Sequence, residues 1–237
     1  HGELAYLTDV HGLGQKIGAL CLRKVLQEKK SNVEKYCITE SIYKNLAETI
    51  EINSQLVKKT KYTITRTQPV ASDQETLEKV ILTTGIIGNT KGSIYCNNFC
   101  HNPKTLSEYS IVVDGKTDGT LKPSDFDDRV TLMLRHELLD EKEYIKNFES
   151  ATFIFIPQLF LNEYELVYSG LLETCLNLCV PIISKRSPFL ADIEYNFGPI
   201  GILFEDPDEI RSYPFAEITK HELRRFRENM VRYHETI

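Results

Sequence analysis

The sequence predicts an α/β protein with a parallel β-sheet. Short apolar runs of strand length alternate with longer segments whose apolar residues recur at helical spacing. The clearest unit is residues 153–184, where an apolar run (153–156) stops at Pro157 and a polar loop follows. An amphipathic segment (165–179) and a second apolar run (180–183) complete it. A strand, a loop, a helix and a strand in this order make one βαβ unit.

The same patterns place further elements along the chain. Strands are expected at residues 34–38, 62–66, 80–84, 109–114, 129–136 and 198–204, with a shorter apolar piece at 4–10. Helices are expected at residues 19–30, 42–51, 138–150 and 219–234, and a loop at 185–193 leads into another. The glycine-rich stretch 85–92 and Gly115 are expected to form turns.

The polar stretch at residues 68–72 has the composition of a linker. We therefore expect two units, residues 1–72 and residues 73–237. The length of 237 residues suffices for one large domain or two modest ones.

Composition narrows the functional classes. The chain is 41% hydrophobic and has no apolar run near the roughly 20 residues of a membrane span, so we expect a soluble, cytoplasmic protein. Its net charge is −6, and its one basic cluster is Arg224, Arg225 and Arg227, which argues against nucleic acid as a partner. Peripheral contact with the inner face of a membrane stays compatible with this charge.

The six cysteines are scattered and follow no secretory signal, which predicts reduced thiols. Cys96-x3-Cys100-His101 has ligand-like spacing, so a zinc site is an alternative. The other close pair, Cys175 and Cys179, lies on the apolar segment, so buried thiols are the preferred interpretation.

Two carboxylates stand in the 153–184 unit, beyond the strand end where ligands of parallel sheets bind. Glu165 and Glu173 are eight residues apart, slightly more than two helical turns, so on one helix they would share a face. Glu173 has apolar neighbours, and a buried Glu needs a partner such as a ribose diol. Two ordinary surface carboxylates on an amphipathic helix are the alternative.

This Glu-x7-Glu segment, preceded by a strand ending in Pro and followed by Cys-Val-Pro-Ile-Ile-Ser, resembles the nucleotide-binding segment of retaining GT-B glycosyltransferases. It is most similar to family 4, which builds bacterial surface polysaccharides. The resemblance implies that Glu165 contacts the transferred sugar and Glu173 the ribose hydroxyls. Ser169 and Gly170 resemble the subgroup in which a Ser-Gly at the helix start lets backbone N–H groups approach the donor diphosphate.

The resemblance covers residues 79–234 and implies a Rossmann-like donor-binding domain at residues 73–237. Residues 1–72 would be the trailing part of a second Rossmann-like domain, which binds the acceptor. The chain begins with His1 and complete enzymes of this group are longer, so we expect part of that domain to be missing. The implied activity is hexosyltransferase-like transfer from a UDP- or GDP-linked sugar to a glycan or lipid-linked acceptor, with retention and without a metal.

Three further residues belong to the expected donor site. The turn at residues 85–92 offers N–H groups, such as that of Gly88, to phosphate oxygens, and Lys91 adds a positive charge. It is similar to the first strand-loop of the family's donor domain, where an Arg and a Lys grip the diphosphate. Lys91 matches the Lys, whereas Ile86 stands where the Arg would be. His136 lies at a strand end, and the resemblance places it beside the nucleobase.

Two other functions stay open. Gly12-x-Gly14-x3-Gly18, between a short apolar run and a helical segment, has features of a dinucleotide phosphate loop, with Glu34 as the ribose acid of an NAD(P)-binding protein. A non-catalytic nucleotide-binding module is the other.

Overall fold

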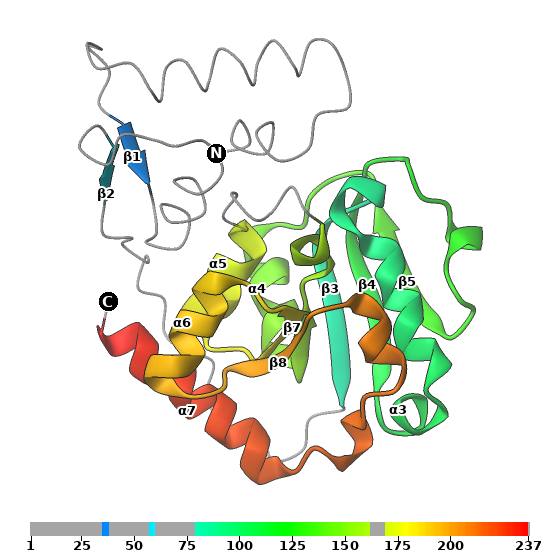
Figure 1. Cartoon of the computed structure of the whole chain (residues 1–237). Coiled ribbons are helices and arrows are strands. Elements are labelled where there is room, and N and C mark those ends of the chain that lie inside the picture. Colours follow the sequence, from blue (N-terminus) through cyan, green and yellow to red (C-terminus); the bar gives the residue numbers. More distant parts are fainter. Residues whose placement is uncertain (1–34, 38–56, 60–78, 162–168, 237) are drawn as a thin grey trace.

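The computed structural model describes residues 35–37, 57–59, 79–161 and 169–236 of the chain (Figure 1). The strand expected at residues 34–38 is confirmed as β1 (Lys35–Cys37), which pairs in parallel with β2 (Val57–Lys59). The patterns in the sequence did not indicate β2. Other expectations lie outside the described residues: the elements at 4–10, 19–30, 42–51 and 62–66, the glycines between 12 and 18, and the linker at 68–72.

The main body is a six-stranded parallel sheet, in the order β5-β4-β3-β6-β7-β8. Its strands are β3 (Val80–Ile87), β4 (Ser110–Thr117), β5 (Val130–Arg135), β6 (Phe153–Phe155), β7 (Ile182–Lys185) and β8 (Gly201–Phe204). The first strand of this sheet, β3, lies at its centre, and the chain builds outward on one side and then on the other. The order therefore reverses between β3 and β6, where parallel sheets of this kind bind their ligands.

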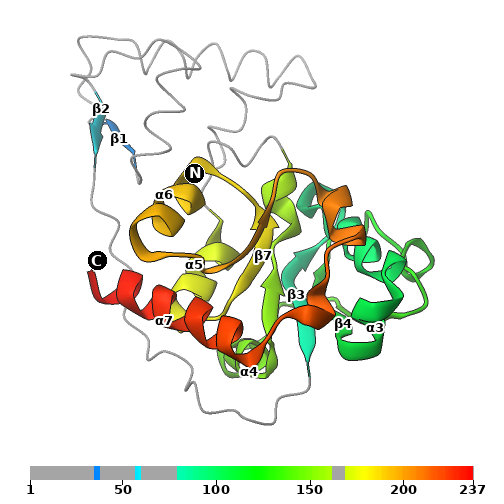
Figure 2. The ribbon, with the colours of Figure 1, turned by 60° about the horizontal axis from the view of Figure 1, so that its bottom comes forward.

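Helices connect the strands. The α-helices are α3 (Pro103–Glu108), α4 (Glu141–Ser150), α5 (Gly170–Leu178), α6 (Pro188–Phe197) and α7 (Lys220–Thr236). The 3-10 helices are η2 (Asn89–Lys91), η3 (Ser93–His101), η4 (Pro123–Asp125), η5 (Pro157–Phe160), η7 (Pro207–Arg211) and η8 (Phe215–Glu217). Figures 1 and 2 show α5 and α6 beside β7, and α3 near β4, with α7 running past α5 and α6.

A hydrophobic core covers each face of the sheet, because successive strand residues point to opposite faces. On β6, Phe153 packs into one core and Ile154 into the other. The first core also holds Ile81, Val113, Cys96, Phe99 and Phe215, and the second holds Leu82, Phe148, Leu172, Leu176 and Leu190.

Two strands are longer than the sequence predicts. β3 continues through Gly85 to Ile87, and β4 continues through Gly115 to Thr117, so neither glycine begins a turn. The two glycines are opposite each other in the register, and a Cβ atom on Gly115 would collide with the backbone carbonyl of Gly85. Glycine at position 115 therefore permits the close approach of two strands. It does not form the turn that was expected from the sequence.

The predicted helix at residues 165–179 is also corrected at its start. Ser169 has an extended backbone (φ −88°, ψ 122°), and α5 begins at Gly170. The helix ends where Cys179 adopts a left-handed conformation. Since α5 does not run back to Glu165, the expectation that Glu165 and Glu173 share a face of one helix loses its basis.

Candidate functional site

The segments that follow β3 and β6 meet at the reversal of the strand order. The Gly88–Gly92 turn follows β3, and η5 follows β6 from Pro157. Gly92 has φ +64°, and a Cβ atom there would lie 2.9 Å from Pro157 O, so only glycine fits both the backbone and the contact. The turn that carries Lys91 is thus held against the end of β6.

The start of α5 is held by two buried side chains. Ser169 Oγ caps the helix by accepting the N–H of Leu172 at 3.3 Å. The same oxygen accepts a hydrogen bond from Gln158 Nε2 at 2.9 Å. Gly170 follows as the first helical residue; it is exposed, with open space where a side chain would be. Gln158 was not expected from the sequence, because a single amide after an apolar strand matches no motif.

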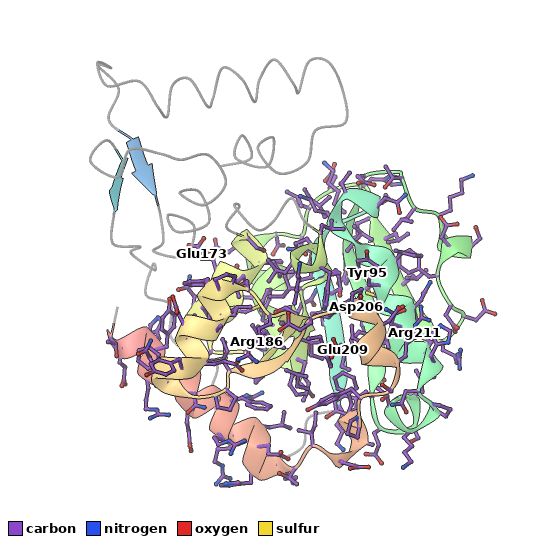
Figure 3. The ribbon with its side chains drawn as sticks, in the orientation of Figure 1. Tyr95, Glu173, Arg186, Asp206, Glu209 and Arg211 are labelled. Carbon is purple, nitrogen blue, oxygen red and sulfur yellow. The ribbon has the colours of Figure 1, made fainter. Side chains whose placement is uncertain are left out.

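Glu173 lies half-buried in the first turn of α5, where the helix dipole favours a negative charge. No described residue forms a hydrogen bond or ion pair with its carboxylate. Figure 3 shows Glu173 at a distance from the charged residues that follow β8, such as Asp206 and Arg211. Glu165 lies outside the described residues, so its role at the site stays a prediction.

The Gly88–Gly92 turn is also fixed to the loop that follows β4. Asn89 N donates to Thr120 Oγ1 at 2.8 Å, and Thr90 Oγ1 donates to Asp118 Oδ2 at 3.3 Å. Partial burial opposes the charge of Asp118, but hydrogen bonds from Thr120 and Thr90 and the nearby charge of Lys91 lower the pKa of this carboxyl. Lys91 therefore lies within the field of a carboxylate.

Gly88 serves the packing between these two loops. A Cβ atom on Gly88 would overlap the carboxylate of Asp118. Its N–H donates to Ser93 Oγ at 3.1 Å, and its carbonyl accepts the N–H groups of Lys91 and Ser93. The N–H of Gly88 is thus engaged within the turn, which corrects the expectation that it is offered to a phosphate oxygen.

A hollow of about 220 Å³ opens beside this turn, at the carboxyl end of β3. It is lined by Gly85, Ile86, Leu138, Leu139 and Tyr144. The lining is largely apolar, and burial raises the pKa of the Tyr144 phenol to about 12. His136 is exposed in the bend that leads from β5 to Leu138, so the sequence placed it correctly at a strand end near the ligand side.

A buried charge stabilises the strand behind this bend. Asp114 of β4 accepts from Arg135 Nε at 2.7 Å and Nη2 at 3.2 Å, and from Asn147 Nδ2 of α4 at 2.8 Å. The Asp114 side chain is 2% exposed. It therefore joins β4, β5 and α4.

The cysteines behave as buried thiols. Burial raises the pKa of Cys96 to about 12 and that of Cys100 to about 11. Within the part of the chain that the structure describes, no group of three or more His, Cys, Asp or Glu could hold a metal ion. The zinc alternative at Cys96, Cys100 and His101 therefore finds no ligand set among these residues.

Fold and site together define a Rossmann-like α/β domain whose ligand side lies at the reversal between β3 and β6. Among solved structures, the chain is similar to WaaG, a glycosyltransferase involved in lipopolysaccharide biosynthesis. The identity is 12% over 95% of this chain and 64% of that one, with a TM-score of 0.59. It is also similar to an E. coli trehalose-6-phosphate structure with UDP-2-fluoro glucose bound: 10% identity, 95% and 56% covered, TM-score 0.50.

These similarities confirm the expected fold, a Rossmann-like sheet of the GT-B glycosyltransferase type. The chain spans about 64% of the length of WaaG. No protein-family model and no curated protein matches the sequence. None of the described helices is long and apolar enough to cross a bilayer.

Proposed function

We propose that this chain binds a nucleoside-diphosphate sugar and belongs to a glycosyltransferase of the retaining family 4 type. The observation that carries the proposal is the meeting of three segments at the strand-order reversal: the Lys91 turn, the end of β6 and the capped start of α5. Such a position gathers N–H groups and a cation where a diphosphate would need them.

Under this proposal the diphosphate lies between Lys91 and the first turn of α5. N–H groups near Ser169 and Gly170, with the Lys91 charge, would stabilise the negative charge that develops on the leaving diphosphate. This stabilisation is preorganised, because Ser169 is fixed by Gln158 and the Lys91 turn is fixed by Thr120 and Asp118.

Glu173 would bind the ribose hydroxyls, and Glu165 would contact the transferred sugar. A half-buried carboxylate without a hydrogen-bonding partner among the described residues suits a diol, which offers two donors. The apolar hollow at Ile86, Leu138 and Tyr144 has the character of a nucleobase site, and His136 precedes Leu138 by two residues. The acceptor, a glycan or lipid-linked glycan, and any peripheral membrane contact belong to the same proposal.

Calorimetric titration of UDP, GDP and NADPH tests this function and separates it from the NAD(P)-binding alternative. We expect UDP or GDP to bind, and Glu173→Ala to weaken that binding about tenfold because a ribose contact is lost. Unchanged nucleotide affinity in Glu173→Ala would defeat the site assignment. Preferred binding of NADPH would favour the dinucleotide alternative. Hydrolysis or transfer of the sugar by the protein, lost in Glu173→Ala, would exclude a purely non-catalytic module.

A further inference from the structure

We propose that Gln158 is a positioning residue for the nucleotide: it orients Ser169 and, through it, the first turn of α5. This inference rests on the proposed function, because it assumes that the start of α5 contacts the ligand. Gln158 itself is assigned no contact with the substrate.

The first observation is the burial of a fully polar pair. Gln158 is 9% exposed and Ser169 is 3% exposed, and Gln158 Nε2 donates to Ser169 Oγ at 2.9 Å. A buried amide without a partner costs stability, and the hydrogen bond to Ser169 avoids that cost. The bond joins the end of β6 to the start of α5, across eleven residues of sequence.

The second observation is how the hydroxyl of Ser169 is used. Its oxygen has two acceptor sites, and these take the N–H of Leu172 and the amide of Gln158. The hydroxyl proton is therefore directed away from both donors, and no described residue accepts it. Gln158 thus determines the direction in which the hydroxyl proton of Ser169 points. With a helix cap alone, this hydroxyl group would be free to rotate.

The third observation is that the next helix, α6, has a similar cap with one donor fewer. Helix α6 also begins with a serine, Ser187, whose Oγ accepts the N–H of Leu190 at 3.2 Å. No second side chain donates to Ser187 among the described residues. Helix α6, which has Pro188 at its first position, thus begins on a serine cap without a second side-chain donor, and the amide of Gln158 is an addition specific to α5.

The fourth observation concerns the other neighbour of this segment. Pro157, directly before Gln158, contacts Gly92 at the end of the Lys91 turn. The short segment Pro157–Gln158 thus touches both parts of the proposed diphosphate site. A change at Gln158 should alter the orientation of α5 relative to the Lys91 turn.

The test is a double-mutant cycle on nucleotide affinity, measured by calorimetry with UDP and, in parallel, GDP on the full chain. Gln158→Met keeps the side-chain length and removes the donor, and we expect it to raise the dissociation constant roughly fivefold to tenfold. Ser169→Ala should have an effect at least as large. Because Gln158 acts through Ser169, the double variant should bind no more than about twofold more weakly than Ser169→Ala alone.

Ser187→Ala is the matched control. It removes a helix cap without leaving a buried amide unpaired, so it should lower the melting temperature by less than Ser169→Ala does. It should leave the dissociation constant within about twofold of the unaltered chain. If Gln158→Met does not fold, Gln158→Asn keeps the amide and shortens its reach. It should also bind more weakly.

Two results would overturn the role of Gln158: affinity equal to the unaltered chain in a folded Gln158 variant, or effects of Gln158→Met and Ser169→Ala that multiply in the double variant. Absence of UDP and GDP binding by the unaltered chain is a different result, which would overturn the proposed function itself.

Discussion

Arg135 Nε lies 2.7 Å from Oδ1 of Asp114, and the two side chains differ widely in exposure, 40% for the arginine and 2% for the aspartate. This asymmetry predicts unequal effects of substitution. Arg135→Met leaves a buried carboxylate with Asn147 as its remaining side-chain donor, and should therefore lower the free energy of unfolding more than Asp114→Asn does. Asp114→Asn leaves a guanidinium that water reaches, and should cost about 1 kcal/mol.

Urea denaturation measures both effects. Arg129→Met is the control, because the Arg129–Asp127 pair lies at the surface, with side chains 53% and 28% exposed, and should change stability little. Equal losses of unfolding free energy in Arg135→Met and Arg129→Met would show that the Arg135–Asp114 pair stabilises the protein no more than the surface pair does.

Gly115 and Gly88 are both close to other atoms, but for different reasons. Alanine at position 115 meets the backbone of Gly85, which cannot move without breaking the strand pairing, and we expect a loss of about 3 kcal/mol. Alanine at position 88 meets the Asp118 side chain, which can rotate away once it gives up its hydrogen bonds, at a cost of about 1 kcal/mol.

Asp118→Ala should therefore rescue Gly88→Ala and leave Gly115→Ala unaffected, as thermal melts of the two double variants would reveal. Failure of that rescue would contradict the packing described for the two loops.

Ile86 offers a place for a second cation. Its side chain is 46% exposed at the carboxyl end of β3, beside the hollow and near the Lys91 turn. Ile86→Arg should tighten the binding of UDP or GDP about threefold to tenfold, because a cation is added near the proposed diphosphate. The gain should shrink in about 0.5 M salt, whereas Ile86→Gln should give no gain. Because position 86 also lines the hollow, Ile86→Gln controls for the bulk of a longer polar side chain. Weaker binding by Ile86→Arg than by Ile86→Gln at low salt would argue that the diphosphate lies elsewhere.

The buried thiols predict a dependence of stability on pH. Cys96 and Cys179 have pKa values of about 12 and Cys100 of about 11 when folded, chiefly through burial, against about 8.5 for an unfolded thiol. Above about pH 8.5 the unfolded chain loses protons that the folded chain keeps, so stability should fall as pH rises toward 11.

Denaturant midpoints between pH 7 and pH 10 measure this slope, and Cys96→Ala should reduce it. Peptide mapping after thiol labelling at pH 8 should find these three cysteines unmodified in the folded protein. Rapid labelling of Cys96 under these conditions would contradict its burial.

The sequence predicted those parts of the fold that depend on local patterns. Phe153–Phe155 and the helix ending at Leu178 follow from apolar periodicity, and Asp140 was visible as the acidic start of α4. Features that depend on distant partners were missed. The role of Gly115 depends on Gly85, which lies opposite it on the neighbouring strand. The role of Gln158 depends on its hydrogen bond to Ser169. The start of α5 was predicted at residue 165 instead of Gly170, because the apolar residues before Ser169 continue the helical spacing beyond the true cap.

The most direct measurement is a crystal structure of the full chain soaked with a UDP- or GDP-linked sugar. We expect the diphosphate within hydrogen-bonding distance of Lys91 Nζ and of an N–H group in the first turn of α5, with the ribose hydroxyls on Glu173. A nucleotide bound away from the reversal between β3 and β6, with Glu173 untouched, would contradict it.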